Sequence, residues 1–335
     1  MKFSSGMKTF VIVNPASGNG KTGERWAKVE MALRKAIGPF ASAQTKGPGD
    51  ATKFVQKALA EKFVRIIVYG GDGTINEAVN GLFEGKRPIK IKTLLGIIPA
   101  GTGGDFRKSL GLTAKISQAI DVIAHGHSEM IDVGRVTFEA NNGKPEERHF
   151  ANMTGIGLSG DVMRRVNKAN TSKSFGAGFA FKLATLTSMM GNKNRMMRVE
   201  VEGFKPLYEM ACSVHVCNGR FAGGGMMFAP YAELNDGKLD IVLLGDFKIF
   251  NLLVESRDLY SGKHLKNPKV QAYQGEKIKV SSDEKVFLEV DGETPGVLPA
   301  SFEVIPKSLK VICPVNFGRK IIVDAKKKTK GAKPA

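Results

Sequence analysis

The sequence predicts two domains, an N-terminal α/β domain and a C-terminal domain of mostly antiparallel strands. Before residue 131, short apolar runs alternate with amphipathic helical segments, a pattern typical of an α/β layer with a mostly parallel sheet. From residue 131 onward, Gly, Asn and Asp separate many strand-like runs, which favours an antiparallel sandwich or barrel. The length of 335 residues also fits about two domains.

The elements of the first domain follow from apolar spacing. A strand is expected at 8–13, and Trp26, Val29, Leu33 and Ile37 recur at helical spacing, which predicts a helix over 24–37. The remaining expected elements are a strand at 40–45, a helix with Asp50 as N-cap, a buried strand at 64–69, a helix marked by Ile75, Ala78, Val79 and Leu82, and a strand at 94–98.

The second domain is predicted from shorter runs. Strands are expected at 131–138, 147–153, 197–201, 208–218, 239–244, 270–280, 285–290 and 301–304. Helices are expected within 161–190 and, more weakly, at 250–261. We therefore divide the chain into an α/β domain at 8–130, completed by 308–323, a β-rich domain at 131–307, and a disordered basic tail at 326–335.

Composition limits the kinds of partner. The 50 Lys and Arg residues outnumber the 32 Asp and Glu residues, which gives a formal net charge of +18 and favours an anionic partner such as a nucleotide, a nucleic acid or an anionic membrane surface. The three cysteines form no Cys-x-x-Cys pair, which argues against disulfides or a zinc site and for a reducing compartment. The first residues are too short and polar for a signal peptide, and no apolar run reaches the ~20 residues of a spanning helix.

Three loops at 14–20, 70–76 and 99–105 follow predicted strands of the first domain and are rich in Gly, Ser, Thr or Asp. In an open parallel sheet these strand ends line the ligand crevice. Glycine lets the backbone approach a phosphate closely, and N–H groups at helix starts attract its charge. One such loop alone favours an ordinary strand–helix turn, whereas three together favour a nucleotide phosphate.

Two more familiar motifs fail on spacing. A Walker A loop ending at Gly20, Lys21 and Thr22 needs a glycine where the chain has Pro15. The Gly18-x-Gly20-x-x-Gly23 match lacks the acidic residue expected about 20 positions later, since the second strand runs into Thr45 and Lys46. The sequence therefore argues against NAD-dependent redox chemistry.

Six motifs occur in one order along the chain: Asn14 to Gly18, Gly70 to Glu77, Pro99 to Phe106, Gly219 to Gly225, Ala229-Pro230 with Asn235-Asp236-Gly237, and Val290 to Glu293. This ordered set resembles the diacylglycerol kinase and sphingosine kinase superfamily, most closely its soluble bacterial lipid kinases, over about residues 8–315. The resemblance implies an NAD-kinase-like α/β nucleotide-binding domain, a C-terminal antiparallel β-sandwich domain, and a cleft between them for ATP and lipid.

The resemblance also implies site residues. The residues expected to contact the nucleotide are Asn14, Pro15, Ala16, Ser17, Gly18, Thr45, Gly70, Gly71, Asp72, Gly73, Thr74, Ile75, Asn76 and Thr102. Asp72 and Asp105 are expected to hold Mg²⁺ or water near the phosphates, with helix capping as the alternative for each. Glu293 matches the family's proton acceptor, and Asp72 is the rival base.

A second Mg²⁺ is implied in the β-rich domain, with Asp236 as ligand beside the carbonyls of Glu233 and Lys238; the alternative is a simple turn aspartate. The chain departs from the family at Gly104, where an Asn is usual, so the positioning of Asp105 or of the phosphates could differ.

The segment 161–198 combines eight basic residues with interleaved aromatic and aliphatic ones, a composition that suits an anionic bilayer as well as a core helix with a solvated face. No RNA- or DNA-binding module is recognisable. We expect an ATP- and Mg²⁺-dependent lipid kinase that is cytoplasmic, binds peripherally to anionic membranes and can form a homodimer. The alternatives are an NAD-kinase-like small-molecule kinase and a non-catalytic, nucleotide-dependent membrane-binding protein.

Overall fold

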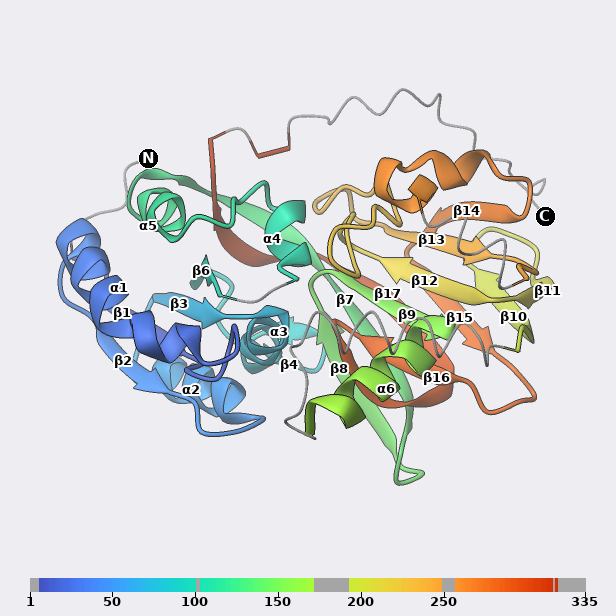
Figure 1. Cartoon of the computed structure of the whole chain (residues 1–335), viewed down its shortest axis with the longest axis horizontal. Coiled ribbons are helices and arrows are strands. Elements are labelled where there is room, and N and C mark those ends of the chain that lie inside the picture. Colours follow the sequence, from blue (N-terminus) through green and yellow to red (C-terminus); the bar gives the residue numbers. More distant parts are fainter. Residues whose placement is uncertain (1–5, 101–102, 172–192, 249–256, 316, 319–335) are drawn as a thin grey trace.

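The computed structural model describes residues 6–100, 103–171, 193–248, 257–315 and 317–318. Figure 1 shows an α/β half on the left and a β-rich half on the right. Two long strands, β7 (His127–Ala140) and β17 (Glu293–Cys313), run between the halves and pair with each other in antiparallel fashion. Strand β7 continues across residue 130, where the sequence analysis places the boundary between the two domains. That boundary therefore stays a prediction.

The first half contains a parallel sheet in the order β2-β1-β3-β6, which confirms the expected alternation of strands and helices. Its strands are β1 (Thr9–Val13), β2 (Ala41–Gln44), β3 (Arg65–Gly70) and β6 (Leu94–Pro99). Its helices are α1 (Lys21–Ile37), α2 (Asp50–Ala60), α3 (Asp72–Gly81), α4 (Asp105–Ser109) and α5 (Ile116–His125). A small hairpin of β4 (Phe83–Glu84) and β5 (Arg87–Pro88), which the sequence analysis missed, follows α3.

Asp50 begins α2 instead of capping it, because the N-cap is Gly49 in a left-handed conformation. The Asp50 carboxylate accepts the N–H groups of Lys46 and Gly47 in the preceding loop. The predicted cap was therefore wrong by one residue, although the carboxylate does order the turn that leads into the helix.

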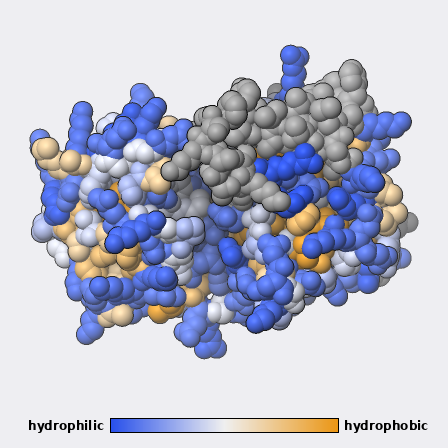
Figure 2. All heavy atoms as spheres, turned by 60° about the horizontal axis from the view of Figure 1, so that its bottom comes forward, coloured by the Kyte–Doolittle hydropathy of each residue, from blue (hydrophilic) through white to orange (hydrophobic). Residues whose placement is uncertain are grey.

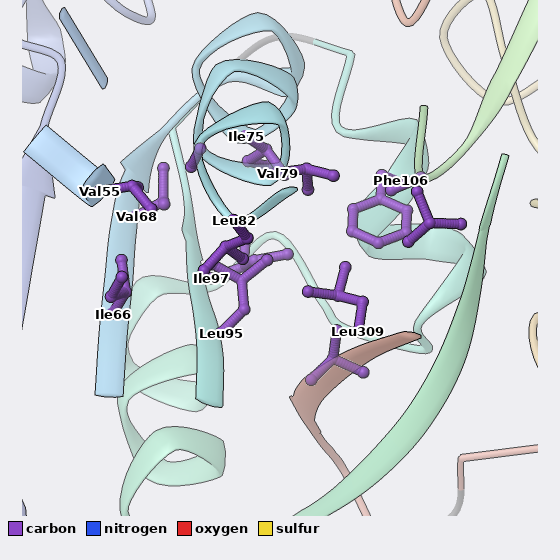
Figure 3. Close-up of a cluster of buried hydrophobic side chains, with 14 of the residues drawn as sticks. Val55, Ile66, Val68, Ile75, Val79, Leu82, Leu95, Ile97, Phe106 and Leu309 are labelled. Atoms are coloured by element: carbon purple, nitrogen blue, oxygen red, sulfur yellow. The ribbon is translucent and has the colours of Figure 1, made fainter. Parts of the chain in front are cut away.

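Two apolar clusters hold the helices to opposite faces of this sheet. Trp26, Val29 and Leu33 of α1 pack with Ile120 and Ile123 of α5. On the other face α2 and α3 cover the sheet, and Figure 3 shows side chains of this second cluster. It includes Val55, Ile66, Val68, Ile75, Val79, Leu82, Leu95, Ile97, Phe106 and Leu309. Leu309 belongs to β17, so the second cluster joins the two halves.

The end of the described chain returns to the first sheet. Lys310 and Val311 of β17 pair in parallel with Leu94 and Leu95 of β6. The chain after residue 308 was expected to return to the α/β domain, and this pairing shows that Lys310 and Val311 do so. One strand therefore adds to the α/β sheet with its last residues and to the β-rich half with its first ones.

The second half is a sandwich of two antiparallel layers that share β17. One layer has the order β14-β13-β12-β9-β16-β17, and the other connects β8, β7, β17, β15, β10 and β11. The strands not yet given are β8 (Pro145–Phe150), β9 (Met153–Gly157), β10 (Arg195–Val201), β11 (Leu207–Ala211), β12 (Ser213–Cys217), β13 (Leu239–Leu244), β14 (Val270–Gly275), β15 (Lys277–Ser281) and β16 (Phe287–Val290). Side chains of both layers, such as Phe150, Val214, Leu288 and Phe302, form one core, which confirms the predicted sandwich.

Three predicted strands are each divided in two, because the chain changes layer within them. The run 147–153 becomes β8, which pairs with β7, and β9, which pairs with β12 and β16. The runs 208–218 and 270–280 divide in the same way, into β11 and β12 and into β14 and β15. Conversely, 301–304 and 311–313 belong to the single strand β17.

Helices are few among the described residues of this half. Helix α6 (Leu158–Thr171) occupies the start of the predicted helical segment, and 172–192 lie outside the described residues. Of the weaker predicted helix, 257–261 are helical and the rest is outside the description; a short 3₁₀ helix, η1 (Lys263–Lys266), follows. Figure 2 shows hydrophilic side chains over most of one face, with hydrophobic ones in small patches. In the part of the chain that the structure describes, no helix combines the length and apolar character needed to cross a bilayer.

Candidate active site

The three predicted loops meet at the carboxyl ends of β1, β3 and β6. Asn14 Nδ2 donates to Thr74 Oγ1 at 2.8 Å, and the Gly71 N–H donates to Ser17 Oγ at 3.3 Å. Gly18 has a φ of 61°, and a Cβ placed on it would lie 2.6 Å from the carbonyl oxygen of Ala100. The close approach of the first and third loops therefore requires glycine at this position.

Hydrogen bonds within the first loop and to the beginning of α1 order this loop. Asn14 Oδ1 accepts the Ala16 N–H, and the Pro15 carbonyl accepts the Gly23 N–H of α1. Thr45 lies beside this loop, because its N–H donates to the carbonyl of Val13 at the end of β1. The residues predicted for nucleotide binding in this region therefore lie together at one edge of the sheet.

The residues of the second loop that were predicted to contact the nucleotide lie in different surroundings. Gly70 is close-packed, since a Cβ there would lie 2.8 Å from Thr74 Cβ. The side chain of Ile75 packs in the core below the loop. Asn76 is buried, and its Nδ2 donates to the His149 carbonyl and to Asp291 Oδ2, both in the second half, at 2.9 Å. The amide of Asn76 therefore joins the halves, and its predicted nucleotide contact stays a prediction.

Asp72 begins α3 and connects the second and third loops. Its Oδ2 accepts the N–H of Gly104 at 2.9 Å and that of Asp105 at 3.4 Å, whereas its buried Oδ1 has no hydrogen-bond partner among the described residues. Burial raises the pKa of Asp72, the Asp105 carboxylate raises it further, and neighbouring N–H groups lower it. The free Oδ1 is the atom of this loop cluster best suited to accept a cation or a polar hydrogen.

Asp105 is the first residue of α4, whose N-cap is Gly104, and its carboxylate does not cap the helix. Its Oδ1 pairs with Lys108 Nζ at 2.9 Å, and its Oδ2 accepts the Gly224 N–H at 2.8 Å. The glycine-rich segment of the second half thus reaches the end of the third loop. Sequence reasoning did not single out Lys108; its position three residues after Asp105, on the same helix face, is the signal that could have found it.

Gly104 adopts a left-handed conformation with a φ of 58°. A Cβ there would lie 2.5 Å from Arg107 Nε, at the flexible end of that side chain. Because Gly104 contributes its backbone N–H to Asp72, the contact that orders this loop does not depend on a side chain at 104.

Glu293 lies opposite the second loop. A Cβ placed on Gly73 would be 3.6 Å from Glu293 Oε1, an ordinary van der Waals separation. The residue is exposed overall, but desolvation by the surrounding protein raises the pKa of its carboxyl; Arg148 counteracts this pKa shift and Glu77 reinforces it. Glu293 also borders a hollow of about 410 Å³, lined further by Ala140, Asn141, Asn142, Glu146, Arg148, Thr294 and Pro295.

The turn before Glu293 is anchored by Asp291, which the sequence analysis cited only as part of a motif. Its carboxylate accepts three backbone N–H groups at the junction of β8 and β9, from Ala151, Asn152 and Met153, in addition to the Asn76 amide. Burial raises the pKa of Asp291 to about 6 against these hydrogen bonds. The second loop and the turn that carries Glu293 are therefore fixed to each other through one side chain.

The predicted site at Glu233, Asp236 and Lys238 lies in a turn of the second half. Asp236 Oδ1 accepts the Lys238 N–H at 3.0 Å, and the nearby Asp132 accepts the Gly237 N–H at 2.7 Å. Burial raises the pKa of Asp236, and the charges of Asp132 and Glu233 raise it further. No group of three His, Cys, Asp or Glu side chains within the described ranges is arranged to hold a metal ion, so this Mg²⁺ stays a prediction.

Several predicted features fall outside the described residues: Thr102, most of the basic segment, and the tail at 326–335. A second hollow, of about 530 Å³, lies far from the loops on β7, β10, β15 and β17. Its charged lining residues are Arg135, Lys277, Lys279, Glu200, Glu202 and Glu303, an equal number of bases and acids that favours no particular ligand charge.

Comparisons with known proteins agree with this geometry. The diacylglycerol kinase catalytic domain matches residues 8–136, and the YegS C-terminal NAD kinase beta sandwich-like domain matches residues 152–313. A diacylglycerol kinase of Staphylococcus carnosus is 31% identical over 304 residues, which cover 91% of this chain and 94% of that protein. The chain belongs to the diacylglycerol kinase family. The lipid kinase resemblance seen in the sequence is thereby confirmed.

Solved structures support the assignment to the diacylglycerol kinase family. A crystal structure described as a diacylglycerol kinase from Bacillus anthracis is 28% identical and has a TM-score of 0.68 over 91% of this chain and 96% of that chain. A yeast NADH kinase, 10% identical with a TM-score of 0.50 over 94% of this chain and 85% of that chain, shares the fold alone. The predicted NAD-kinase-like architecture with a C-terminal sandwich is thus confirmed.

Proposed function

We propose that this lipid kinase family member transfers the γ-phosphate of ATP to the hydroxyl of diacylglycerol or a related long-chain lipid. The observation that carries the proposal is the position of Glu293, whose carboxylate lies across from Gly73 of the glycine-rich second loop. The γ-phosphate of a nucleotide bound on that loop would face the Glu293 carboxylate. That carboxylate can accept the proton of the attacking hydroxyl.

The loops supply the nucleotide site in this proposal. Backbone N–H groups of the Gly18 turn and of the first turn of α3, which begins at Asp72, suit the negative charge of phosphates. Hydrogen bonds of Asn14 to Thr74 and of Gly71 to Ser17 hold the loops together through the protein's own groups. Such preorganisation reduces the entropy lost when the phosphates and the acceptor are aligned.

Glu293 is the proposed base and Asp72 its rival. A base works best when its pKa lies near the working pH, and desolvation raises the pKa of the Glu293 carboxyl in that direction. Asp72 also has a raised pKa, but its Oδ2 already accepts two N–H groups of the third loop. We therefore assign proton acceptance to Glu293 and loop organisation to Asp72.

The residues present fit a Mg²⁺ ion near the phosphates. Asp72 Oδ1 is buried without a hydrogen-bond partner within the described residues, and oxygen atoms are the ligands that Mg²⁺ prefers. The Asp105 carboxylate is occupied by Lys108 and Gly224, so Asp72 is the residue that would hold the ion. When bound, Mg²⁺ neutralises phosphate charge. We keep the second Mg²⁺, at Asp236 with the carbonyls of Glu233 and Lys238, as part of the proposal.

The lipid acceptor implies contact with a membrane surface. The net charge of +18 supports peripheral binding to anionic lipid, and we propose that this occurs from the cytoplasm, without a nucleic-acid partner and with a homodimer as a possible assembly. The basic segment that prompted this idea lies mostly outside the described residues. Pelleting with neutral and anionic vesicles tests the electrostatic part, because equal binding to both would contradict it.

The decisive assay uses γ-labelled ATP and Mg²⁺ with a panel of lipids in anionic mixed micelles, beside NAD and a buffer blank. Label in an organic-phase lipid would support the proposal and identify the acceptor. Label only in NAD would instead indicate a small-molecule kinase. ATP binding without transfer to any acceptor would indicate a non-catalytic, nucleotide-dependent protein.

A further inference from the structure

One buried acid close to the proposed base has no part in the mechanism above. Glu289 of β16 is 8% exposed and lies opposite Gly155 of β9 in the antiparallel register. A Cβ on Gly155 would lie 2.8 Å from Glu289 Oε2 and would also collide with Ser159 Oγ. The glycine therefore creates the niche that admits the Glu289 carboxyl between two strands and a helix.

Both oxygens of Glu289 have polar neighbours in different parts of the structure. Oε1 accepts the Gly292 N–H at 2.6 Å, within the turn that leads to Glu293. Oε2 lies 3.4 Å from the hydroxyl of Ser159 in the first turn of α6. The side chain thus connects the turn before the proposed base to a helix of the second half.

The turn is held from two sides. Asp291 has a φ of 43° and fixes the beginning of the turn to Asn76 and to the junction of β8 and β9. Glu289 holds the next residue, Gly292, which itself has a φ of 96°. Glu293 follows directly, so its direction toward Gly73 depends on both contacts.

We propose that Glu289 is a positioning residue that holds Gly292, and through it Glu293, at the glycine-rich second loop, and that it links this turn to α6. The inference rests on the proposed function, because it takes Glu293 as the base. Glu289 does not touch the reacting atoms and is not itself a catalytic residue.

The protonation state of Glu289 follows from its surroundings. Burial raises the pKa of Glu289 to about 8, the Gly292 N–H lowers it, the Asp291 charge raises it, and Ser159 and Glu293 have smaller opposing effects. The groups that face it among the described residues are Asp291 in the turn, Glu293 on β17, Cys217 on β12 and Ser159 on α6. The charged Asp161 of α6 pairs with Arg195 instead. At neutral pH the carboxyl is therefore mostly protonated, and a glutamine is close to it in shape and charge.

Two substitutions of Glu289 test its contact with Gly292. Glu289→Gln keeps an oxygen that can accept the Gly292 N–H, whereas Glu289→Ala removes the Glu289 acceptor of that hydrogen bond and opens a cavity. Asp283→Asn, an exposed carboxylate before β16, is the matched control for charge. We expect Glu289→Ala to lower kcat about tenfold or more with little change in the KM for ATP, because small displacements of a reacting group have large effects on rate. Glu289→Gln and Asp283→Asn should stay within about threefold of the parent, since neither removes the contact to Gly292.

The pH profile provides a second readout. Above about pH 8 the wild type should lose activity, because ionised Glu289 adds a charge beside Asp291 and Glu293. This alkaline decline should be absent in Glu289→Gln and unchanged in Asp283→Asn. Identical alkaline limbs in the wild type and Glu289→Gln would contradict the proposal, as would wild-type kcat in Glu289→Ala or an equal loss in the Gln and Ala variants.

Amide hydrogen exchange at Gly292 separates this inference from the proposed function, because it requires no turnover. Slow exchange in the wild type and Glu289→Gln, with fast exchange in Glu289→Ala, supports the contact even if no lipid is phosphorylated. Equal exchange in all three overturns it even if the wild type is an active lipid kinase. If Glu289→Ala does not fold, amide exchange will be fast throughout the sandwich core. The comparison of the alkaline pH profiles of the wild type and Glu289→Gln then tests the proposal.

Discussion

Asn76 Nδ2 donates a hydrogen bond to Asp291 Oδ2 at 2.9 Å, across 215 positions of the sequence. Asn76 belongs to the helix that begins at the glycine-rich second loop, and Asp291 belongs to the turn that carries Glu293. This bond joins the proposed phosphate-binding loop to the turn that carries the proposed base; Asn76 is buried and Asp291 is half-buried.

Asn76→Asp should destabilise the protein by roughly 2–4 kcal/mol, because a buried donor is replaced by a charge that faces the Asp291 carboxylate and the His149 carbonyl. Denaturant unfolding followed by circular dichroism measures the change. Asn142→Asp is the matched control, since the exposed Asn142 Oδ1 accepts the Lys144 N–H and an aspartate can still do so. Equal unfolding midpoints for both variants would contradict the importance of this bond.

Glu293→Gln should lower kcat by about 10²–10⁴-fold, because an amide cannot accept the hydroxyl proton. The KM for ATP should change little, since the proposed role of Glu293 is to accept the proton of the acceptor hydroxyl. Steady-state assays with the lipid found to be the acceptor give both constants. Glu139→Gln, an exposed residue of β7, is the control. If Glu293→Gln keeps wild-type turnover while Asp72→Asn loses it, Asp72 is the base.

Gly18→Ala should weaken ATP binding by about tenfold or more, because its Cβ would collide with the Ala100 carbonyl at 2.6 Å and overpacking costs about 1–3 kcal/mol. Gly20→Ala is a close control: its φ of 87° also strains an alanine, but nothing lies within 4 Å of the added Cβ. Calorimetric titration with ATP compares the two. Similar affinities in both variants would show that backbone strain, and not the contact between the loops, sets the effect.

Gly104→Asn should cost less than about 1 kcal/mol of stability, because asparagine tolerates a left-handed backbone and only the flexible end of Arg107 has to move. Its kcat should stay at or above the wild-type value, since the Gly104 N–H to Asp72 is kept. Gly104→Val, with a branched Cβ, should be less stable than Gly104→Asn. Thermal unfolding and the labelled-ATP assay measure both effects, and an asparagine variant as unstable as the valine variant would be the contrary result.

His215 should contribute a loss of stability as the medium becomes acidic, whereas the raised pKa values of Glu289 and Asp291 contribute in the opposite direction. Burial lowers the pKa of His215 from 6.5 to about 3, with a further decrease from His264. The unfolded chain therefore takes up this proton first as the pH falls below 6.5, and the free energy of unfolding should drop by roughly 1.4 kcal/mol per pH unit from this side chain.

Urea unfolding from about pH 7 to about pH 5 measures this slope. His215→Asn should remove a loss of roughly 1.4 kcal/mol per pH unit from the measured dependence, whereas His125→Asn, at an exposed histidine, should leave the dependence unchanged. A slope that is identical in the wild type and His215→Asn would assign the acid sensitivity to other groups.

Local sequence was enough to predict the kinds of element and the positions of the three glycine-rich loops. Apolar spacing predicted α1 and the strands of the parallel sheet, because a helix face and a doubly buried strand leave different periods in the sequence. The glycines at 18, 70, 71 and 73 and the acids at 72, 105 and 293 were also found from the chain alone, since turns and charges are local features. Membership of a lipid kinase family followed from the order of those motifs.

The contacts between residues far apart in the chain became visible only in the folded structure. Apolar periodicity could not show that the chain changes layer at Ala151–Asn152 or at Cys212. The apolar pattern of a strand is the same in either layer of a sandwich. The roles of Asp291 and Glu289 were hidden for the same reason: their partners, Asn76 and Ser159, lie 215 and 130 positions away. The direction of a buried carboxyl depends on which N–H groups the fold brings to it, and local sequence does not contain that information.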